Sequence, residues 1–329
     1  MLKTPDTTNM LAELYQPIER ELAQVEEILR DELSSSHPPV NELLSRSNRL
    51  SGKRLRPALL LLFARACGKI SIDHLTLAAA MEMVHTATLV HDDILDSADQ
   101  RRHHQTINSE FGNQAAVLTG DYLFSHAFYL TSTLATPFAA REIGKATNRV
   151  CEGEIRQIGT RERLELEEKE YLEIIDSKTA VLCSCSAKLG AHYAAGSDPM
   201  VAAASRYGTS LGIAFQIVDD LLDILGCESE AGKSLGTDLD QCKPTLPVIH
   251  CLASLNESSR TTLKERLLHS GVESEEMKQL LFEQGSIEYT KSRANEFAQQ
   301  ASQAISIYPE SRTRKILERL PSFVLQRTH

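Results

Sequence analysis

The chain has 329 residues, of which 42% are hydrophobic, and a formal net charge of −10 at pH 7. This apolar content is sufficient for one large core or two smaller ones, and it excludes an intrinsically disordered chain. The negative charge argues against nucleic acid as the main partner, because phosphate backbones are held by basic surfaces. The seven cysteines form no zinc-type CxxC pair, which indicates free thiols in a reducing compartment.

No segment of the sequence is apolar enough to predict a membrane span. The longest unbroken apolar run, residues 58–64, is far shorter than the roughly 18 to 20 residues that a membrane helix requires. Residues 1–10 contain an acidic side chain and no apolar block, so they do not resemble a secretory signal. We therefore expect a cytoplasmic protein with a disordered segment at residues 1–11 and a single domain at residues 12–329.

Six stretches show the three- and four-residue spacing of apolar side chains that indicates amphipathic helices. They cover residues 75–99, 114–133, 138–158, 168–195, 200–225 and 277–307. Few windows alternate with the period of two that a half-buried strand shows. The sequence therefore predicts an all-α fold, a single-domain bundle of roughly ten or more helices.

Four loops are expected between these helices, at residues 68–73, 101–106, 196–199 and 226–243. The last is long for a helix connection, and a long loop beside a site often serves as a lid.

Two of the predicted helices carry the same acidic pattern, with first members 127 residues apart. The first cluster is Asp92, Asp93 and Asp96, and the second cluster is Asp219, Asp220 and Asp223. In each, the first and last aspartates lie on one helix face about one turn apart. Carboxylates at this spacing repel each other, so the helix requires a compensating cation. Magnesium commonly takes one or two carboxylates together with substrate phosphates. Two such clusters on apolar helices favour a magnesium and diphosphate site over two solvated helix ends.

Basic residues and a histidine supply candidate partners for a second anion. Residues 52–57 hold Lys53, Arg54 and Arg56 directly before an apolar helix, where charge and free backbone N–H groups would bind a diphosphate. His85 precedes Asp92 by seven residues and so lies on nearly the same face, roughly 10 Å along the axis. This alignment favours a polar role for His85.

The order of these motifs resembles the trans-type polyprenyl diphosphate synthase family, most closely its medium- and long-chain, octaprenyl-type members. The resemblance runs from about residue 12 to residue 327 and includes Arg101 and Arg102 after the first cluster and residues 236–238 after the second. It implies an isoprenoid synthase fold around a central cavity, a homodimer, and about two or three Mg²⁺ ions per site.

The resemblance also implies a role for each candidate residue. Magnesium would be held by Asp92, Asp93, Asp96, Asp219, Asp220 and Asp223, with Asp93 and Asp220 supporting or joining the other four. Isopentenyl diphosphate would be bound by Lys53, Arg56, His85 and Arg102. An allylic diphosphate such as farnesyl diphosphate would be bound by Arg101, Lys178, Thr179, Gln216 and Lys233. Asp92, Asp96, Asp219 and Lys178 would act directly in catalysis.

Two local features need separate interpretation. His103 and His104 stand where the family usually has glycine after the arginine pair, so the turn there is expected to differ. Glu152 and Glu154 resemble the family's Glu-Gly-Glu segment, and we interpret them as structural or supporting residues.

Product length is expected to depend on the two residues before Leu89. In short-chain members of the family a bulky aromatic in this region blocks the growing chain, whereas Ala87 is small and Thr88 follows it. The sequence therefore favours a medium or long product, with Phe124, Phe128 and Tyr129 as candidates for a deeper floor.

Four alternatives remain. One is a short-chain farnesyl or geranylgeranyl diphosphate synthase, and another is a non-catalytic subunit that regulates a partner synthase. A class I terpene cyclase shares the first motif, but its second is typically of the Asn/Asp-Ser/Thr-Glu type. A di-iron bundle requires Glu-x-x-His on two helices, and only Glu82 and His85 supply one.

Overall fold

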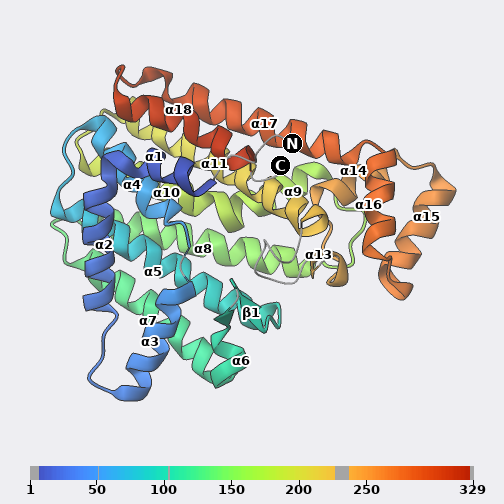
Figure 1. Ribbon diagram of the computed structural model, residues 1–329, viewed down its shortest axis with the longest axis horizontal. Helices are drawn as coiled ribbons and strands as arrows, with labels where there is room; N and C mark the ends of the chain where they lie inside the picture. The colour runs from blue at the N-terminus through green and yellow to red at the C-terminus, as the bar shows by residue number, and fades with distance from the viewer. Residues whose placement is uncertain (1–6, 51, 103, 227–236, 327–329) are drawn as a thin grey trace.

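The computed structural model describes residues 7–50, 52–102, 104–226 and 237–326, and this part of the chain is built almost entirely of helices (Figure 1). The first half contains α1 (Thr7–Tyr15), η1 (Gln16–Ile18), α2 (Glu19–Glu32), α3 (Pro38–Leu50), α4 (Leu55–Cys67), α5 (Ile72–Leu95), α6 (Ile107–Phe111), α7 (Asn113–Ser132) and α8 (Phe138–Gly159). The second half contains α9 (Glu168–Ile175), η2 (Asp176–Ala180), α10 (Val181–Tyr193), α11 (Asp198–Leu225), α13 (Thr237–Asp240), α14 (Leu246–Ser254), α15 (Glu257–Glu265), η3 (Arg266–Ser270), α16 (Ser274–Glu283), α17 (Ser286–Ala304), η4 (Ile305–Ile307) and α18 (Arg312–Leu325). The expected all-α fold is confirmed.

Helix α5 lies at the centre of the bundle. Its N-cap is Ser71, whose backbone N–H donates a hydrogen bond of 3.0 Å to Nδ1 of His74 in a capping box. Residues 78–80 are three fully buried alanines, whose small side chains let neighbouring helices approach closely. Helices α4, α7 and α10 pack against α5, and α11 packs against α10. The main apolar core therefore surrounds the helix that carries the first acidic cluster.

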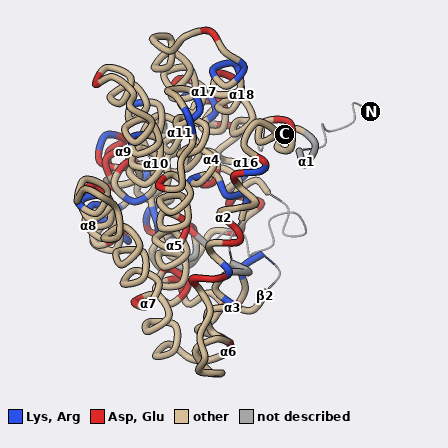
Figure 2. Tube along the Cα trace, turned by 90° about the vertical axis from the view of Figure 1, so that its left-hand side faces the viewer, with Lys and Arg blue, Asp and Glu red and all other residues tan. Residues whose placement is uncertain are grey.

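Helix α8 is joined to the following helical segment by charges as well as by apolar contacts. Arg156 lies 2.9 Å from Glu173 of α9, and Arg149 lies 2.6 Å from Asp176 of η2. Figure 2 shows these basic and acidic stretches close together near α8 and α9. Since Lys178 also lies in η2, these pairs help to fix a segment that holds a candidate site residue.

Most of the predicted helices agree with the observed ones, and three differences have physical reasons. Residues 7–11, expected to be disordered, are helical in α1, because Met10 and Leu11 pack against the core. The predicted helix 277–307 is two helices, since Gly285 adopts a left-handed φ of 67° between them. The predicted loop 101–106 contains a two-stranded antiparallel hairpin of β1 (Gln100–Arg101) and β2 (His104–Gln105).

The described helices do not include a candidate membrane span. None of them combines sufficient length with the apolar character needed to cross a bilayer.

Candidate active site

The two acidic clusters occupy the last turns of two helices. Helix α5 ends at Leu95 and α11 ends at Leu225, so Asp92 and Asp219 each lie near a helix C terminus. A helix C terminus carries partial negative charge, which makes additional carboxylates there unfavourable unless cations lie nearby. Each cluster therefore requires positive charge from elsewhere in the protein or from a bound ion.

The segment after the second cluster links it to the first. The Lys243 ammonium lies 3.0 Å from Asp96 Oδ1 and 3.5 Å from Asp238 Oδ1. The backbone N–H of Asp238 donates a hydrogen bond of 3.1 Å to Asp223 Oδ2. These contacts connect the two clusters through residues 238–243, although the clusters are distant in the sequence.

Asp96 is also close to an arginine that sequence reasoning missed. Arg161, in the turn after α8, lies 3.4 Å from Asp96 Oδ1. Burial is the largest single effect and would raise the pKa of Asp96, but Lys243, Lys178 and Arg161 together outweigh it, and the pKa is lowered. Arg161 belongs to none of the motifs, and the alternating charges of Arg161, Glu162 and Arg163 resemble a solvated loop.

Lys178 brings a third cation to the same region. Its ammonium lies 2.5 Å from Glu154 Oε2 and donates a hydrogen bond of 2.8 Å to Gln157 Oε1. Burial would lower the pKa of Lys178, but the carboxylates of Asp92 and Glu154 outweigh it and raise the pKa. Burial in turn raises the pKa of Asp92 to about 6, against the opposing effect of Lys178. The half-buried Lys178 ammonium thus contacts Glu154 and Gln157 of α8 and interacts with Asp92 of the first cluster.

Lys178 is presented by the π-helical turn η2, which interrupts the helix predicted over residues 168–195. Such turns inside α-helices are frequent at functional sites. The turn lies against Gly153 of α8, where an added Cβ would come within 2.7 Å of the Lys178 backbone nitrogen and 3.0 Å of Ser177 Cβ. In the Glu-Gly-Glu segment, Gly153 therefore allows η2 to approach α8 closely, and Glu154 pairs with Lys178. Both contributions agree with a supporting role for this segment.

The middle aspartate of the second cluster is held by neighbouring side chains. Asp220 is only 6% exposed, and its Oδ2 accepts a hydrogen bond of 2.7 Å from the Tyr171 hydroxyl. Its Oδ1 accepts a bond of 2.7 Å from Gln216 Nε2, and Gln216 Oε1 accepts one of 2.7 Å from Thr179. Burial and the nearby Asp238 carboxylate raise the pKa of Asp220 to about 7, against the effect of these hydrogen bonds. The predicted residues Thr179, Gln216 and Asp220 therefore lie together.

A second group of cations gathers around His85. Gly52 lies against the Arg102 guanidinium, since an added Cβ would be 2.2 Å from Arg102 Nη2. Burial lowers the pKa of His85 well below its usual range, and Arg56, Arg102 and Arg101 lower it further. Arg56 Nε is buried without a hydrogen-bond partner among the described residues. Arg56, His85 and Arg102 together form a basic site. In this site, Arg56 Nε could donate a hydrogen bond to a bound anion.

The other two cations of residues 52–57 have different surroundings. Arg54 donates hydrogen bonds of 2.5 and 2.8 Å to Glu26 and one of 2.8 Å to Glu82, so it joins α2 and α5. Lys53 is exposed, and its ammonium lies 5.5 Å from the centre of the Phe323 ring in α18. Adjacent cations in one motif therefore have separate roles, and Arg54 is structural.

Arg101 contacts the first cluster directly. Its Nε and Nη2 each lie 2.7 Å from Asp93 Oδ1, so hairpin strand β1 is fixed to the end of α5. Asp93 is 1% exposed, and its other oxygen, Oδ2, is buried without a hydrogen-bond partner among the described residues. Arg101, which was predicted to bind the allylic diphosphate, is thus paired with Asp93 in this structure. Lys233 and His103 lie outside the described residues.

The chain is similar in sequence and in structure to known proteins. Residues 37–284 match the family model for polyprenyl synthetases. The chain belongs to the polyprenyl synthetase family. It is 34% identical over 319 residues to octaprenyl diphosphate synthase of Haemophilus influenzae, an alignment that covers 96% of this chain and 97% of that protein.

Two crystal structures show the same fold. A decaprenyl diphosphate synthase from Rhodobacter capsulatus has a TM-score of 0.91 and 35% identity, covering 97% of this chain and 99% of that one. A polyprenyl synthase from Caulobacter crescentus, complexed with calcium and isoprenyl diphosphate, has a TM-score of 0.92 and 31% identity, covering 97% and 98%. The resemblance stated from the motifs is confirmed, and this polyprenyl synthetase is a prenyltransferase.

The residues assigned to product length lie in the buried part of α5. Ala87 is fully buried, and the Thr88 hydroxyl donates a hydrogen bond of 2.7 Å to the carbonyl of His85. Phe124 and Phe128 of α7 pack against the core that contains Ala87. Tyr129 is 60% exposed, so its suggested place in a deeper floor is wrong.

The carboxylates of this polyprenyl synthetase fit divalent cations by their chemistry. Both clusters present oxygen donors, which magnesium prefers, and Asp93 Oδ2 is a buried oxygen that lacks a hydrogen-bond partner. Within the described residues, no three His, Cys, Asp or Glu side chains already converge as a metal site. Asp96 is paired with Lys243, and Asp93 is paired with Arg101.

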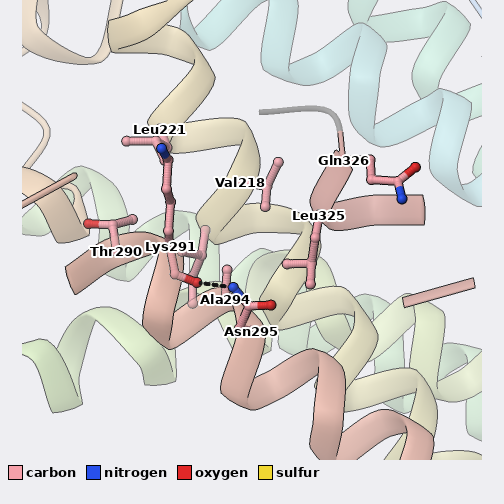
Figure 3. A pocket seen from close by; sticks show the side chains of 9 residues that line it. Val218, Leu221, Thr290, Lys291, Ala294, Asn295, Leu325 and Gln326 are labelled. Atoms are coloured by element: carbon pink, nitrogen blue, oxygen red, sulfur yellow. Dashed lines mark hydrogen bonds between the residues drawn. The ribbon is translucent and has the colours of Figure 1, made fainter. Parts of the chain in front are cut away.

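A cavity of about 100 Å³ lies on the other side of the second acidic helix (Figure 3). Val218 and Leu221 of α11, Ala294 of α17 and Leu325 of α18 are among its lining residues. Ile217 and Leu221, which both line the cavity, each lie about 160° from Asp219 around the helix, given a rotation of roughly 100° per residue. This cavity is therefore separate from the acidic site.

Proposed function

We propose that this prenyltransferase condenses isopentenyl diphosphate head to tail with an allylic diphosphate and releases a linear trans-polyprenyl diphosphate of medium or long chain. The observation that carries the proposal is the pairing of two distinct anion sites. One combines the two acidic clusters with Lys178, and the other is the basic site around His85. A single diphosphate would not require both. The octaprenyl and decaprenyl names of the relatives agree with a long product.

The acidic site would hold the allylic diphosphate through magnesium. Asp92, Asp96, Asp219 and Asp223 are the proposed ligands. The calcium and isoprenyl diphosphate in the Caulobacter relative support a divalent ion next to such a substrate. When bound there, magnesium supplies positive charge that stabilises the departing diphosphate. Lys178 adds a half-buried ammonium group that Glu154 already holds in place and that therefore needs little reorganisation.

The basic site would orient the second substrate. Arg56, His85 and Arg102 bind the diphosphate of isopentenyl diphosphate, so its double bond faces the allylic carbon. Loss of the allylic diphosphate leaves a carbocation, the double bond attacks it, and removal of one proton gives the new allylic product. The released diphosphate is the proposed base. The buried apolar part of α5, which includes Ala87, excludes water from this cation.

Incubation with Mg²⁺, radiolabelled isopentenyl diphosphate and farnesyl diphosphate tests the proposal. We expect label in an extractable product longer than geranylgeranyl diphosphate. A cyclised product without label would indicate a terpene cyclase. Incorporation only after a second protein is added would indicate a regulatory subunit.

Ala87→Phe is expected to shorten the product. Phenylalanine adds a ring at a fully buried position one turn before the first cluster, where the growing chain is proposed to pass. Product sizes are compared by chromatography with those of Ala87→Ser, which keeps a small side chain. An unchanged product distribution in Ala87→Phe would contradict the assignment.

We also propose a homodimer formed through the neighbouring helices α7 and α8. Large apolar side chains are exposed on both, namely Val117, Leu118, Tyr122 and Tyr129 on α7 and Ile155 and Ile158 on α8. Exposed apolar patches commonly mark interfaces, and a second copy would cover this one.

Charge placed on this surface is expected to separate the dimer. The double substitution Leu118→Glu and Ile155→Glu buries two carboxylates at the proposed interface, so sedimentation velocity should show a monomer. Phe282→Glu is the control, since Phe282 is exposed on α16, a different helix. A monomeric unsubstituted protein, or a double variant that remains dimeric, would contradict this interface.

A further inference from the structure

Tyr171 forms a buried contact with the second acidic cluster that none of the sequence motifs indicates. The side chain lies in α9, is 4% exposed, and packs in an apolar cluster with residues of α11. Its hydroxyl donates the 2.7 Å hydrogen bond to Asp220 Oδ2. A buried hydroxyl in contact with a buried carboxylate has a strongly preferred geometry, because neither group has an alternative partner in water.

The contact belongs to a chain of hydrogen bonds between two helical segments. From Asp220 the chain continues through Gln216 to the hydroxyl of Thr179. Tyr171 and Thr179 lie in the continuous segment formed by α9 and η2, and Lys178 stands next to Thr179. The chain therefore fixes the acidic turn of α11 relative to the turn that presents Lys178.

Both oxygens of Asp220 accept hydrogen bonds from neutral donors. Each oxygen of Asp220 therefore has one of its two lone pairs engaged by the protein. The neighbouring Asp219 is half-buried and lies about 100° away from Asp220 around the helix. The middle aspartate thus has the surroundings of an anchor for the turn.

We propose that Tyr171 is a positioning residue, which holds Asp220 and so sets the direction in which Asp219 and Asp223 present their carboxylates to the cation and diphosphate. The inference rests on the proposed function, since it assumes that a cation and a diphosphate bind there. Groups that orient metal ligands from outside typically change metal affinity by about 10- to 100-fold when removed.

Tyr171→Phe tests the inference, with Tyr207→Phe as a matched control. Tyr207 is also buried, and its hydroxyl donates a hydrogen bond of 2.7 Å to the carbonyl of Leu317, away from both clusters. Both variants lose one hydroxyl and one buried hydrogen bond. The dissociation constant of Mg²⁺ with inorganic diphosphate is measured for each by ligand-dependent thermal shift and by calorimetry.

We expect binding to weaken about tenfold in Tyr171→Phe and to remain unchanged in Tyr207→Phe. Without ligand, the unfolding temperatures of the two variants should fall by similar amounts relative to the unsubstituted protein. Equal dissociation constants in Tyr171→Phe and the unsubstituted protein, or equal weakening in both variants, would overturn the positioning role. If the unsubstituted protein does not bind, the proposed function fails and the inference fails with it.

A second comparison decides the question if Tyr171→Phe does not fold. The asparagine carbonyl in Asp220→Asn still accepts the Tyr171 hydrogen bond, whereas Asp219→Asn removes a proposed ligand charge. Binding of Mg²⁺ with diphosphate is expected to weaken less in Asp220→Asn than in Asp219→Asn. Equal losses would show that Asp220 acts as a ligand and would overturn the inference.

Discussion

Replacement of Asp92 or Asp219 by asparagine is expected to lower the rate of isopentenyl diphosphate incorporation by roughly a thousandfold. Asparagine keeps the shape and one oxygen but removes the charge that would hold a cation. The expected loss is large because the leaving diphosphate develops negative charge in a site that excludes water. Glu275→Gln, at a side chain that is 91% exposed, is the control and should keep full activity.

The same substitution, Asp92→Asn, is expected to raise the stability of the folded protein although it lowers the activity. Burial raises the pKa of Asp92 from 3.8 to about 6, so the charged form is disfavoured in the folded protein. A raised pKa contributes stability that is present below the unfolded value and lost as pH rises through the folded value. Without metal, the unfolding temperature of the unsubstituted protein should therefore fall relative to Asp92→Asn between pH 4 and pH 7.

Together the two measurements distinguish a functional carboxylate from a structural one. If Asp92 were structural, its replacement would lower both the stability and the activity of the protein. An active or markedly less stable Asp92→Asn protein would contradict the assignment of this residue.

Gly153→Ala is expected to lower both stability and activity. The added methyl group would come within 2.7 Å of the Lys178 backbone nitrogen, so α8 and η2 have to separate. Overpacking of this kind typically costs about 1 to 3 kcal/mol in the free energy of unfolding. It should also displace Lys178 from Glu154 and Asp92, which would reduce the rate further.

Gly159→Ala is the matched control for this prediction, because Gly159 lies in the same helix and nothing lies within 4 Å of an added Cβ. Alanine there should stabilise the helix by up to about 1 kcal/mol, since it favours helical backbone more than glycine does. Urea unfolding and incorporation assays measure both effects. Equal behaviour of the two variants would show that the close contact at Gly153 is unimportant.

The sequence predicted the parts of the structure that depend on local periodicity. The apolar spacing of residues 75–99 and 200–225 located α5 and α11 to within a few residues, because one buried face determines each helix. The spacing of Asp92 and Asp96 located a carboxylate pair for the same reason. The Glu168–Ile175 helix and its π-helical continuation were predicted as one helix, because a single inserted residue hardly alters the periodicity.

Long-range partners were not predictable from local patterns. The family resemblance assigned Lys53 and Arg56 to a substrate and left Arg54 without a role, and only the fold brings Glu26 and Glu82 to Arg54. The approach of Arg161 to Asp96 depends on how the turn after α8 lies over α5. Such contacts depend on helix packing rather than on residue spacing.

We propose that the two acidic clusters hold one diphosphate between them through divalent cations. Crystals grown with Mn²⁺ and inorganic diphosphate test this arrangement, because anomalous scattering locates the manganese ions. We expect manganese both at Asp92 with Asp96 and at Asp219, with the diphosphate in contact with ions at both clusters. Manganese at one cluster alone, or diphosphate bound away from both clusters, would contradict it.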